Sequence, residues 1–279
     1  MTNKSVCIFP HFYDLNIIPY YVLCYLEQLE KHFDQIIVVS NPRQIDNLSA
    51  LNSEKVKLIF QSNEGYDLGK YLNGFKELNL NEYHQIALIN DSNIVFGNID
   101  FVFDWARDSD LDFWGLVEAN IRPAYSTHDD NYHIQSHFMV FNKNAIPFLE
   151  EFISKLQFEE IIKISDVKAA KRRVINDWEI GLSQFMLKQN LKLGAYVNHT
   201  AKIEDSKGQF YQRLIKDGVP VIKKKVITSL LPRDLFAGEN KWSNLIKAHY
   251  TGQVDVAKLL KELFSIRKRH VLRKIGLSK

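Results

Sequence analysis

Short apolar runs alternate with stretches of helical spacing along the first 92 residues of the chain. Each apolar run ends in polar residues, whereas the stretches between the runs repeat apolar residues every three or four positions. This pattern predicts strands over 5–9, 35–41, 56–63 and 84–92, and helices over 17–33 and 64–78. Strands that alternate with helices are typical of βαβ units, so we expect an α/β fold with a mainly parallel sheet and helices on both faces.

The pattern of the second half is less regular. Strands are predicted over 112–119, 133–142 and 191–197, and amphipathic helices over 145–156 and 175–190. Beyond residue 198 the pattern weakens, with helical stretches near 205–217 and 253–266. No repeat or low-complexity linker divides the chain. We therefore expect one α/β domain over residues 1–230 and a helical, basic extension over 231–279.

The fourth predicted strand has an unusually polar end. Its apolar run stops at Ile89 and is followed directly by the sequence NDSN, in which Asp91 is the acid. Ligands of parallel sheets bind beyond the carboxyl ends of the strands, and the strands over 35–41 and 56–63 also end in Ser and Asn. A carboxylate at this edge is placed to hold Mg²⁺ or Mn²⁺ on a diphosphate. The alternative is an Asx turn that only closes the strand.

A glycine-bearing turn follows the third predicted strand. Gly65 and Gly69 flank Asp67 at the start of the helix predicted over 64–78. Glycine lets the backbone approach a ligand closely. The turn is neither a P-loop nor a GxGxxG fingerprint, so it does not indicate ATP or a dinucleotide. Asp67 is either an acceptor for a base or ribose or a simple helix cap.

Two acids, Asp177 and Glu179, begin the helix predicted over 175–190. The helix dipole favours acids in the first turn, so their position has a purely structural explanation. The functional alternative is a general base that deprotonates an acceptor hydroxyl.

Polar side chains alternate with apolar ones in the strand predicted over 133–142. His133, Gln135 and His137 would then share one face of that strand. Such a face suits either an outer strand or a sugar-binding wall. It does not suit zinc, because no third ligand is spaced to join the two histidines.

Composition narrows the function classes. The net charge of +3 is too small to indicate nucleic-acid binding, and Cys7 and Cys24 lie in apolar stretches that suit reduced core residues of a cytosolic protein. The N-terminal sequence is not that of a signal peptide, and no stretch is long enough for a membrane span, so we expect membrane contact to be peripheral. Residues 265–279 carry six Lys or Arg and no acid, beside apolar residues that begin at Leu259. They form either a basic amphipathic helix on an anionic membrane or a solvated end helix.

The order of these motifs resembles that of the rhamnan synthesis protein F family of bacterial polysaccharide glycosyltransferases, which have a GT-A fold. The motifs are FPHFYD, IIVVSN, NEGYDLGKY, INDSN, DFWGL, HIQSHFMVFN, WEIGLSQFML and DGVPVIKKKVI. Together they cover residues 6–227, and DFWGL and the Gln-Ser-x-Phe core of HIQSHF are the most specific. The resemblance implies a GT-A-like, Rossmann-like sheet.

The resemblance also implies a division of labour. A UDP- or dTDP-linked sugar donor would bind to residues 1–120, and the acceptor would bind to 121–230. That acceptor would be a hydroxyl of a lipid-linked O-antigen, capsule or rhamnan precursor at the cytoplasmic face of a bacterial membrane. The implied donor residues are His11, Asn41, Asn63, Gly65, Asp67, Lys70, Asn90, Asp91 and Ser92. The implied acceptor residues are Trp114, Gly115, His133, Gln135, Ser136 and His137.

Two of these motifs bear on the chemistry of the reaction: one departs from the family pattern and one matches it. NDS stands where many GT-A enzymes carry Asp-x-Asp, so Asn90 and Ser92 replace carboxylates that would hold Mg²⁺ or Mn²⁺ more tightly, and metal dependence stays open. WEIGLS lines up with the Glu-Asp-x-x-Leu-Ser helix start of many inverting GT-A enzymes. The register of Leu182 places Glu179, rather than Asp177, at the base position. The next candidates for the base are Asp112, Glu118, Asp129 and Asp130.

Two other function classes remain. A non-catalytic protein that binds sugar nucleotides or glycans would use the same fold, with Asp91 and Glu179 as simple capping residues. A nucleotidyltransferase that makes the donor is disfavoured, because the N-terminal region lacks a Gly-rich loop with Lys or Arg to hold a triphosphate.

Overall fold

The computed structural model describes residues 4–197, 211, 214–215, 218–229, 241–252, 254–274 and 276. Within this part of the chain, the central sheet has the strand order β3-β2-β1-β4-β8-β6-β7, and β9 pairs with β6. The strands are β1 (Lys4–His11), β2 (Gln35–Ser40), β3 (Val56–Phe60), β4 (Tyr83–Ile89), β6 (Phe113–Ala119), β7 (His133–Ile134), β8 (Phe138–Asn142) and β9 (Leu193–Val197). A separate two-stranded ladder joins β5 (Asn93–Val95) to β10 (Val221–Lys223).

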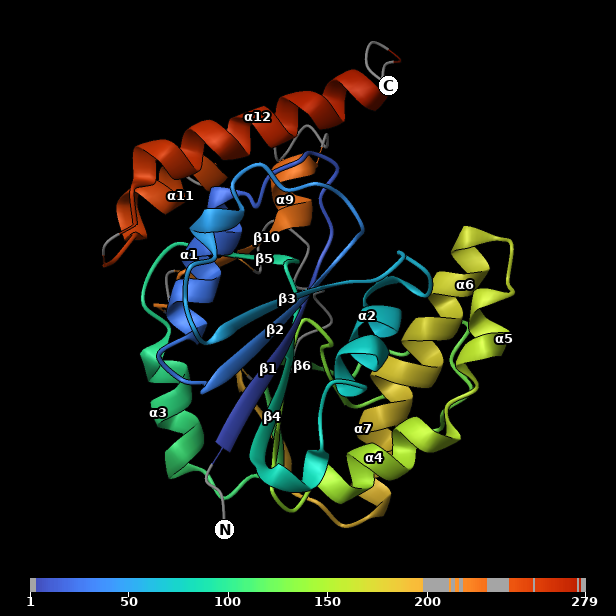
Figure 1. Cartoon of the computed structure of the whole chain (residues 1–279). Helices are drawn as coiled ribbons and strands as arrows, with labels where there is room; N and C mark the ends of the chain where they lie inside the picture. The colour runs from blue at the N-terminus through green and yellow to red at the C-terminus, as the bar shows by residue number, and fades with distance from the viewer. Residues whose placement is uncertain are drawn as a thin grey trace.

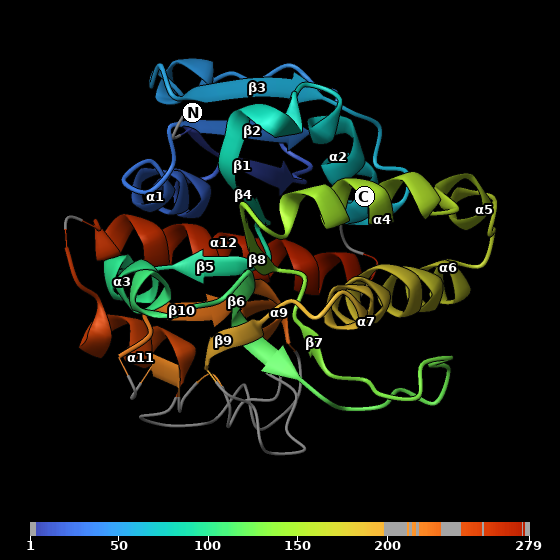
Figure 2. The same cartoon turned by 90° about the horizontal axis from the view of Figure 1, so that it is seen from below.

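Helices cover both faces of the sheet, as Figure 1 and Figure 2 show. One hydrophobic core lies beneath α1 (Tyr20–Leu29), α3 (Asp100–Asp108), α11 (Trp242–His249) and α12 (Val256–Lys274). A second core lies beneath α2 (Tyr66–Phe75), α4 (Ile146–Lys155) and α7 (Gly181–Lys188). The remaining elements are η1 (Leu48–Ala50), η2 (Leu80–Glu82), α5 (Phe158–Ile162), α6 (Val167–Val174), η3 (Ile175–Ile180) and α9 (Lys224–Thr228).

The first half of the sheet is parallel, as the apolar runs predict. β1 pairs in parallel with β2 and β4, and β2 pairs in parallel with β3. β1, β2 and the end of β4 are buried on both faces and therefore read as continuous apolar sequence, whereas β3 lies at the edge of the sheet and is partly exposed. β9 is parallel to β6, and only β8 and β7 run against their neighbours. The expected α/β class with a mainly parallel sheet is therefore confirmed.

The single strand predicted over 133–142 is wrong, because the segment forms two strands, β7 and β8. Glu118 of β6 pairs with Ile134, whereas Gly115 pairs with Met139. The four residues from Gly115 to Glu118 on β6 are thus opposite the six residues from Ile134 to Met139. Two extra residues between β7 and β8 therefore do not pair with β6. A bulge of this kind re-aims side chains. His133, Gln135 and His137 consequently do not share one face.

The helix predicted over 175–190 begins earlier than expected. α6, the π-helical η3 and α7 follow one another without a break from residue 167 to residue 188. The side chain that caps this helix is Asp166, which accepts hydrogen bonds from the backbone N–H groups of Lys168 and Ala169. Asp177 and Glu179 therefore lie in the middle of a long helix, and the helix-start explanation for these two acids is wrong.

The C-terminal part packs into the same protein core as the sheet. Leu259, Leu260 and Leu263 of α12 are buried in the cluster that also contains residues of α1. Figure 1 shows α12 lying across the carboxyl end of the parallel strands. The helix expected near 253–266 is thus present and longer, while most of the one expected near 205–217 lies outside the described residues. No helix in the described ranges is long and apolar enough to cross a membrane.

Candidate active site

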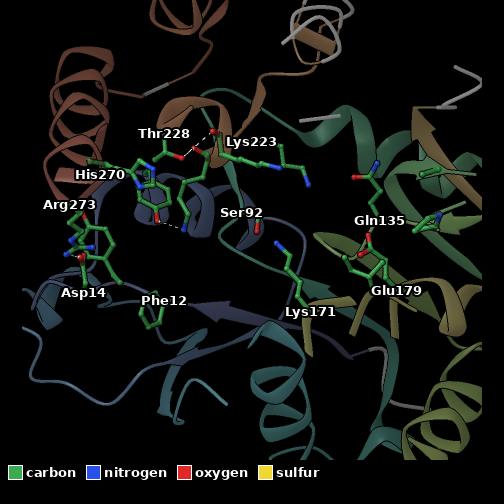
Figure 3. A pocket seen from close by; sticks show the side chains of 18 of the residues that line it. Phe12, Asp14, Ser92, Gln135, Lys171, Glu179, Lys223, Thr228, His270 and Arg273 are labelled. Atoms are coloured by element: carbon green, nitrogen blue, oxygen red, sulfur yellow. Dashed lines mark hydrogen bonds and ion pairs between the residues drawn. The ribbon is translucent and has the colours of Figure 1, made fainter. Parts of the chain in front are cut away.

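A cavity of about 780 Å³ opens at the carboxyl end of the parallel strands. Its walls come from the chain after β1, the end of β4, the β10–α9 junction, η3 and α12. Figure 3 shows Glu179 and Gln135 on one side of the cavity and Asp14, His270 and Arg273 on the opposite side. Lys171, Lys223 and Ser92 lie between the two groups.

The cavity wall is strongly cationic. The basic side chains that line it are Lys171, Lys223, Lys224, Lys225, Arg269, His270 and Arg273. The carboxylates among its described lining residues are Asp14 and Glu179, and Asp14 is already paired with Arg273. A concave site with this excess of positive charge attracts an anionic ligand.

Asp91 lies behind this wall and is almost completely buried, at 6% exposed. Its Oδ2 atom lies 2.9 Å from His11 Nδ1 and 2.9 Å from Lys224 Nζ, and it accepts a hydrogen bond of 3.1 Å from the hydroxyl of Tyr21. Burial alone would raise the pKa of Asp91, but the charges and hydrogen bonds of Lys224 and His11 outweigh it and hold that pKa well below its usual range. The carboxylate is therefore ionised, and its Oδ2 atom is shared by three protein groups.

His11 and Asn41 support the loop that follows β1. His11 is buried, which lowers the pKa of its imidazole, and its Nε2 lies 3.3 Å from Arg43. The Asn41 side chain accepts a hydrogen bond from the backbone N–H of Tyr13 and donates one to its carbonyl. Phe12 and Tyr13, which line the cavity, are held in place by these contacts.

The helix α12 supplies the side of the cavity opposite Glu179. Arg269 donates a hydrogen bond of 2.5 Å to the hydroxyl of Tyr13, and Arg273 forms an ion pair with Asp14. Glu262, about two to three turns earlier on the same helix, anchors α12 to the start of α1. Residues 265–274 are thus part of the site wall, because the apolar side of α12 is buried and fixes which way its basic side chains point.

Glu179 faces the cavity from the π-helical segment η3. Its Oε1 atom accepts a hydrogen bond of 3.2 Å from the backbone N–H of Ser136 and lies 4.0 Å from His133 Nε2. His133 Nδ1 lies 2.7 Å from the carbonyl of Asn131, so a proton on Nδ1 leaves Nε2 turned toward Glu179. Asp177 instead pairs with Arg173 and lines a separate shallow hollow. Residues two positions apart do not share a helix face, which separates the two acids in this way.

The residues around Asp91 do not fit a divalent metal ion. Asn90 uses its side-chain oxygen to accept from the N–H of Ser92, as in an Asx turn, and its amide donates to Asp67. No group of three or more His, Cys, Asp or Glu side chains in the described ranges could hold a metal. Hard cations take oxygen ligands, and here a lysine ammonium already contacts Oδ2 of Asp91, while the carboxylate of Asp67 accepts from the amide of Asn90.

Comparison with known proteins identifies the family. The model of the family described as rhamnan synthesis protein F matches residues 4–255. The chain belongs to this family. Membership confirms the resemblance seen in the motif order and supports a role in polysaccharide synthesis. No curated protein matches the chain.

Solved structures with a related fold are distant. A 4-diphosphocytidyl-2C-methyl-D-erythritol synthase from Anaerococcus prevotii is 14% identical, with 72% of this chain and 92% of that one covered and a TM-score of 0.42. A putative glucose-1-phosphate thymidylyltransferase from Bacillus anthracis is 8% identical, covering 71% and 87%, with a TM-score of 0.43. A putative nucleotide-diphospho-sugar transferase from Desulfovibrio desulfuricans is 11% identical, covering 71% and 81%, with a TM-score of 0.40. These likenesses are too distant to carry a functional argument.

The donor residues that the family resemblance implies gather at one edge, but most of them lie behind the cavity wall. Ser92 lines the cavity, whereas His11, Asn41, Asn90 and Asp91 form the layer that supports it. Asn63 is exposed and lies outside the lining.

Asp67 and Lys70 belong to the same supporting layer. Lys70 is fully buried, donates a hydrogen bond of 2.7 Å to the carbonyl of His11, and has its pKa lowered to about 8 by burial. Burial, together with the charge of Asp91, raises the pKa of Asp67 to about 6.

The glycines of the predicted ligand-binding turn have a different role. Gly65 has φ +69°, and a Cβ there would lie 2.3 Å from the ring of Phe158. A Cβ at Gly69 would lie 2.0 Å from the carbonyl of Glu64. The absence of side chains thus makes room for α5 and for the turn itself, and neither glycine lines the cavity.

Of the implied acceptor residues, some line the cavity and others lie in the hydrophobic core. His133 and Gln135 line the cavity. Trp114 is 1% exposed and packs edge-on against Phe103, and a Cβ at Gly115 would lie 2.2 Å from Ile134, so a sugar-binding role is wrong for both.

Two further acceptor candidates are turned away from the cavity. Ser136 takes part through its backbone groups, which bond Glu179 and Tyr71, and His137 is buried against Asn93. The alternative bases Asp112, Glu118, Asp129 and Asp130 do not line the cavity.

Sequence reasoning missed the cations that shape the site. Lys224 lies in the quoted motif DGVPVIKKKVI, and Arg269 and Arg273 lie in the tail that was interpreted as a membrane-binding or solvated helix. The only signal in the sequence was the clustering of Lys and Arg. Which ligand or surface such a cluster meets depends on packing that the sequence does not display.

Proposed function

We propose that the chain is an inverting glycosyltransferase that moves a sugar from a nucleotide sugar to a glycan hydroxyl. The observation that carries this proposal is the placement of Glu179 across one cavity from the cations of α9 and α12. A base and a diphosphate site on opposite sides of the reacting sugar are what an in-line displacement requires.

The reaction follows from this arrangement. The acceptor O–H gives its proton to the carboxylate of Glu179, and the acceptor oxygen forms a bond to the anomeric carbon of the donor sugar. The bond from that carbon to the β-phosphate oxygen breaks on the opposite side, and its electron pair stays on the nucleoside diphosphate. The lysines and arginines of the wall offset the charge that develops there. The backbone N–H of Ser136 holds the Glu179 carboxylate in position.

The acceptor and the location are finer parts of the proposal. Family membership supports a polysaccharide precursor as the acceptor, and we propose that it is lipid-linked. A peripheral contact with an anionic membrane would rest on exposed basic residues such as Lys261 and Lys268, because the leucines of α12 are committed to the core. Exposed lysines next to such a surface contribute about 1 kcal/mol each.

A donor screen tests the proposal. Thermal shift with UDP-, dTDP- and GDP-linked sugars identifies which nucleotide binds, and radiolabelled donor then measures slow hydrolysis in the absence of acceptor. A competent transferase should have a higher melting temperature with donors of one nucleotide class, and it should slowly release free sugar from those donors. Binding without any hydrolysis or transfer would instead indicate a non-catalytic sugar-nucleotide-binding protein.

A further inference from the structure

We propose that Lys224 takes the place of a divalent metal ion in this site and binds the diphosphate of the donor directly. The inference deepens the proposed function and rests on it. It assigns Asp91 a different role from the metal ligand expected from the sequence. Asp91 holds a lysine, and the lysine contacts the ligand.

The backbone places Lys224 beside the end of β4. β10 pairs with β5 in antiparallel register, which brings Lys223 opposite Asn93. The next backbone N–H, that of Lys224, donates a hydrogen bond of 2.7 Å to the carbonyl of Ser92. This ladder fixes the lysine next to the strand-end carboxylate, although the two segments are more than 120 residues apart in the sequence.

The side chains are layered so that the ammonium, and not the carboxylate, faces the ligand. Lys224 Nζ lies 2.9 Å from Asp91 Oδ2 and donates a hydrogen bond of 3.2 Å to the hydroxyl of Tyr21. The Lys224 side chain is 28% exposed and lines the cavity, whereas the Asp91 side chain is 8% exposed and does not line it. An anion in the cavity therefore meets a pre-positioned ammonium.

A divalent ion that bound Oδ2 of Asp91 would have to displace this arrangement, because His11, Tyr21 and Lys224 already share that atom. The displaced ammonium would remain nearby as a partly buried charge without its partner, which is costly. The two residues that flank Asp91 add no carboxylate, and Asn90 is used by its turn.

The other cations of the wall complete a diphosphate site. Lys225 of α9 and Arg269 and Arg273 of α12 line the same cavity as Lys224. Two of them are held by partners of their own, since Arg269 contacts Tyr13 and Arg273 contacts Asp14. Several fixed positive groups around one cavity can neutralise a diphosphate without an inorganic cation.

Calorimetric titration of the wild-type chain with UDP, dTDP and GDP tests the inference without any variant. Each titration is done in EDTA and again with Mg²⁺ or Mn²⁺. We expect one nucleoside diphosphate to bind with affinities that agree within about threefold, or about 0.7 kcal/mol, in the two buffers. Binding that appears only with metal, or is at least about tenfold tighter with it, would overturn this inference but leave the proposed function standing. Absence of binding in both buffers would overturn the proposed function and this inference together.

Variants identify the residue. Lys224→Met keeps the length of the side chain and removes its charge, and it should weaken nucleoside diphosphate binding by about tenfold or more in EDTA. Lys247→Met on α11, an exposed lysine outside the cavity lining, is the matched control and should bind as the wild type does. Wild-type affinity of Lys224→Met would overturn the inference.

Two more variants keep the test decisive if Lys224→Met unfolds. Lys224→Arg retains the charge and should retain most of the affinity. The double variant Asp91→Asn/Lys224→Met removes the carboxylate that the single variant would leave without its cation, so it should fold and still bind weakly. Wild-type affinity of this folded double variant would overturn the inference.

Discussion

Glu262 and Tyr21 lie 241 positions apart in the sequence, yet Glu262 Oε2 accepts a hydrogen bond of 2.9 Å from the backbone N–H of Tyr21. The other carboxylate oxygen accepts a hydrogen bond of 2.7 Å from the N–H of Tyr20. The residue before α1, Pro19, supplies no side-chain cap. A carboxylate from α12 thus caps α1, and the hydroxyl of the same Tyr21 bonds Asp91 in the layer below the cavity.

Removal of this cap should weaken both the fold and the site. Glu262→Ala leaves two N–H groups of α1 without a partner, and loss of a cap typically costs about 0.5–2 kcal/mol of unfolding free energy. Urea unfolding at pH 7 measures the loss. Lys261→Ala, an exposed neighbour on α12, is the control and should change stability little. Equal stability of the two variants would show that α12 is not held through Glu262.

The two acids of η3 should differ sharply in their effect on catalysis. Glu179→Gln keeps the size of the side chain but cannot take a proton, so the transfer rate should fall by a factor on the order of a hundred or more while donor binding is kept. Asp177→Asn should cost little, because Asp177 pairs with Arg173 outside the cavity. Steady-state kinetics with both variants decide the roles. If Asp177→Asn abolishes turnover and Glu179→Gln does not, our assignment of the base is wrong.

The arginines of α12 should contribute to donor affinity. Arg269→Gln and Arg273→Gln each remove a positive charge from the cavity wall, and we expect each to weaken donor binding by about three- to tenfold at low salt. The deficit should shrink as added salt screens the remaining charges. Lys268→Gln, on an exposed position of the same helix, controls for a general charge effect. Equal losses in all three variants would show that only net charge matters.

Membrane contact should depend on charge rather than on an apolar helix face. The variant Lys261→Gln/Lys268→Gln should sediment less with anionic vesicles than the wild type, and neutral vesicles should not bind either protein. The test is co-sedimentation at low and at physiological salt. Binding that resists salt, or that persists with neutral vesicles, would contradict an electrostatic contact.

Stability should depend on pH through Asp67. Burial, with the charge of Asp91, raises the pKa of Asp67 to about 6 in the folded chain, from about 3.9 in an unfolded one. The folded state therefore binds the extra proton between these values, so the contribution of Asp67 to stability is fully present below about pH 4 and is lost as the pH rises through about 6. Asp67→Asn removes this dependence. The wild type should lose more stability than Asp67→Asn between about pH 5 and 7, by a few kcal/mol at most.

Urea midpoints at the two pH values measure this difference. Glu64→Gln, an exposed neighbour, is the control and should follow the wild type. If the stability of Asp67→Asn depends on pH in the same way as that of the wild type, the pKa of Asp67 is not raised in the folded chain.

The sequence by itself determined the parallel half of the sheet and the meeting of Asp67 with the NDSN strand end. Strands buried on both faces require continuous apolar runs, and parallel strands bring their carboxyl ends to one edge whatever the details of packing. Asn90 indeed donates a hydrogen bond of 2.7 Å to Asp67. The register of Leu182, buried on the face opposite the cavity, also favoured Glu179 over Asp177, and Glu179 is the one that faces the cavity.

Only the tertiary structure decided what surrounds these residues. The bulge between β7 and β8 depends on how the segment pairs with β6, and the continuous helix from α6 to α7 depends on a π-helical register that has no sequence period. The same holds for the cations. A run of lysines or arginines has the same sequence whether it faces solvent, a membrane or a cavity. Burial of Leu259 and Leu263 turns Arg269 and Arg273 into the site, and the β5–β10 ladder sets Lys224 on Asp91, because contacts between distant segments fix where a flexible charged side chain can reach.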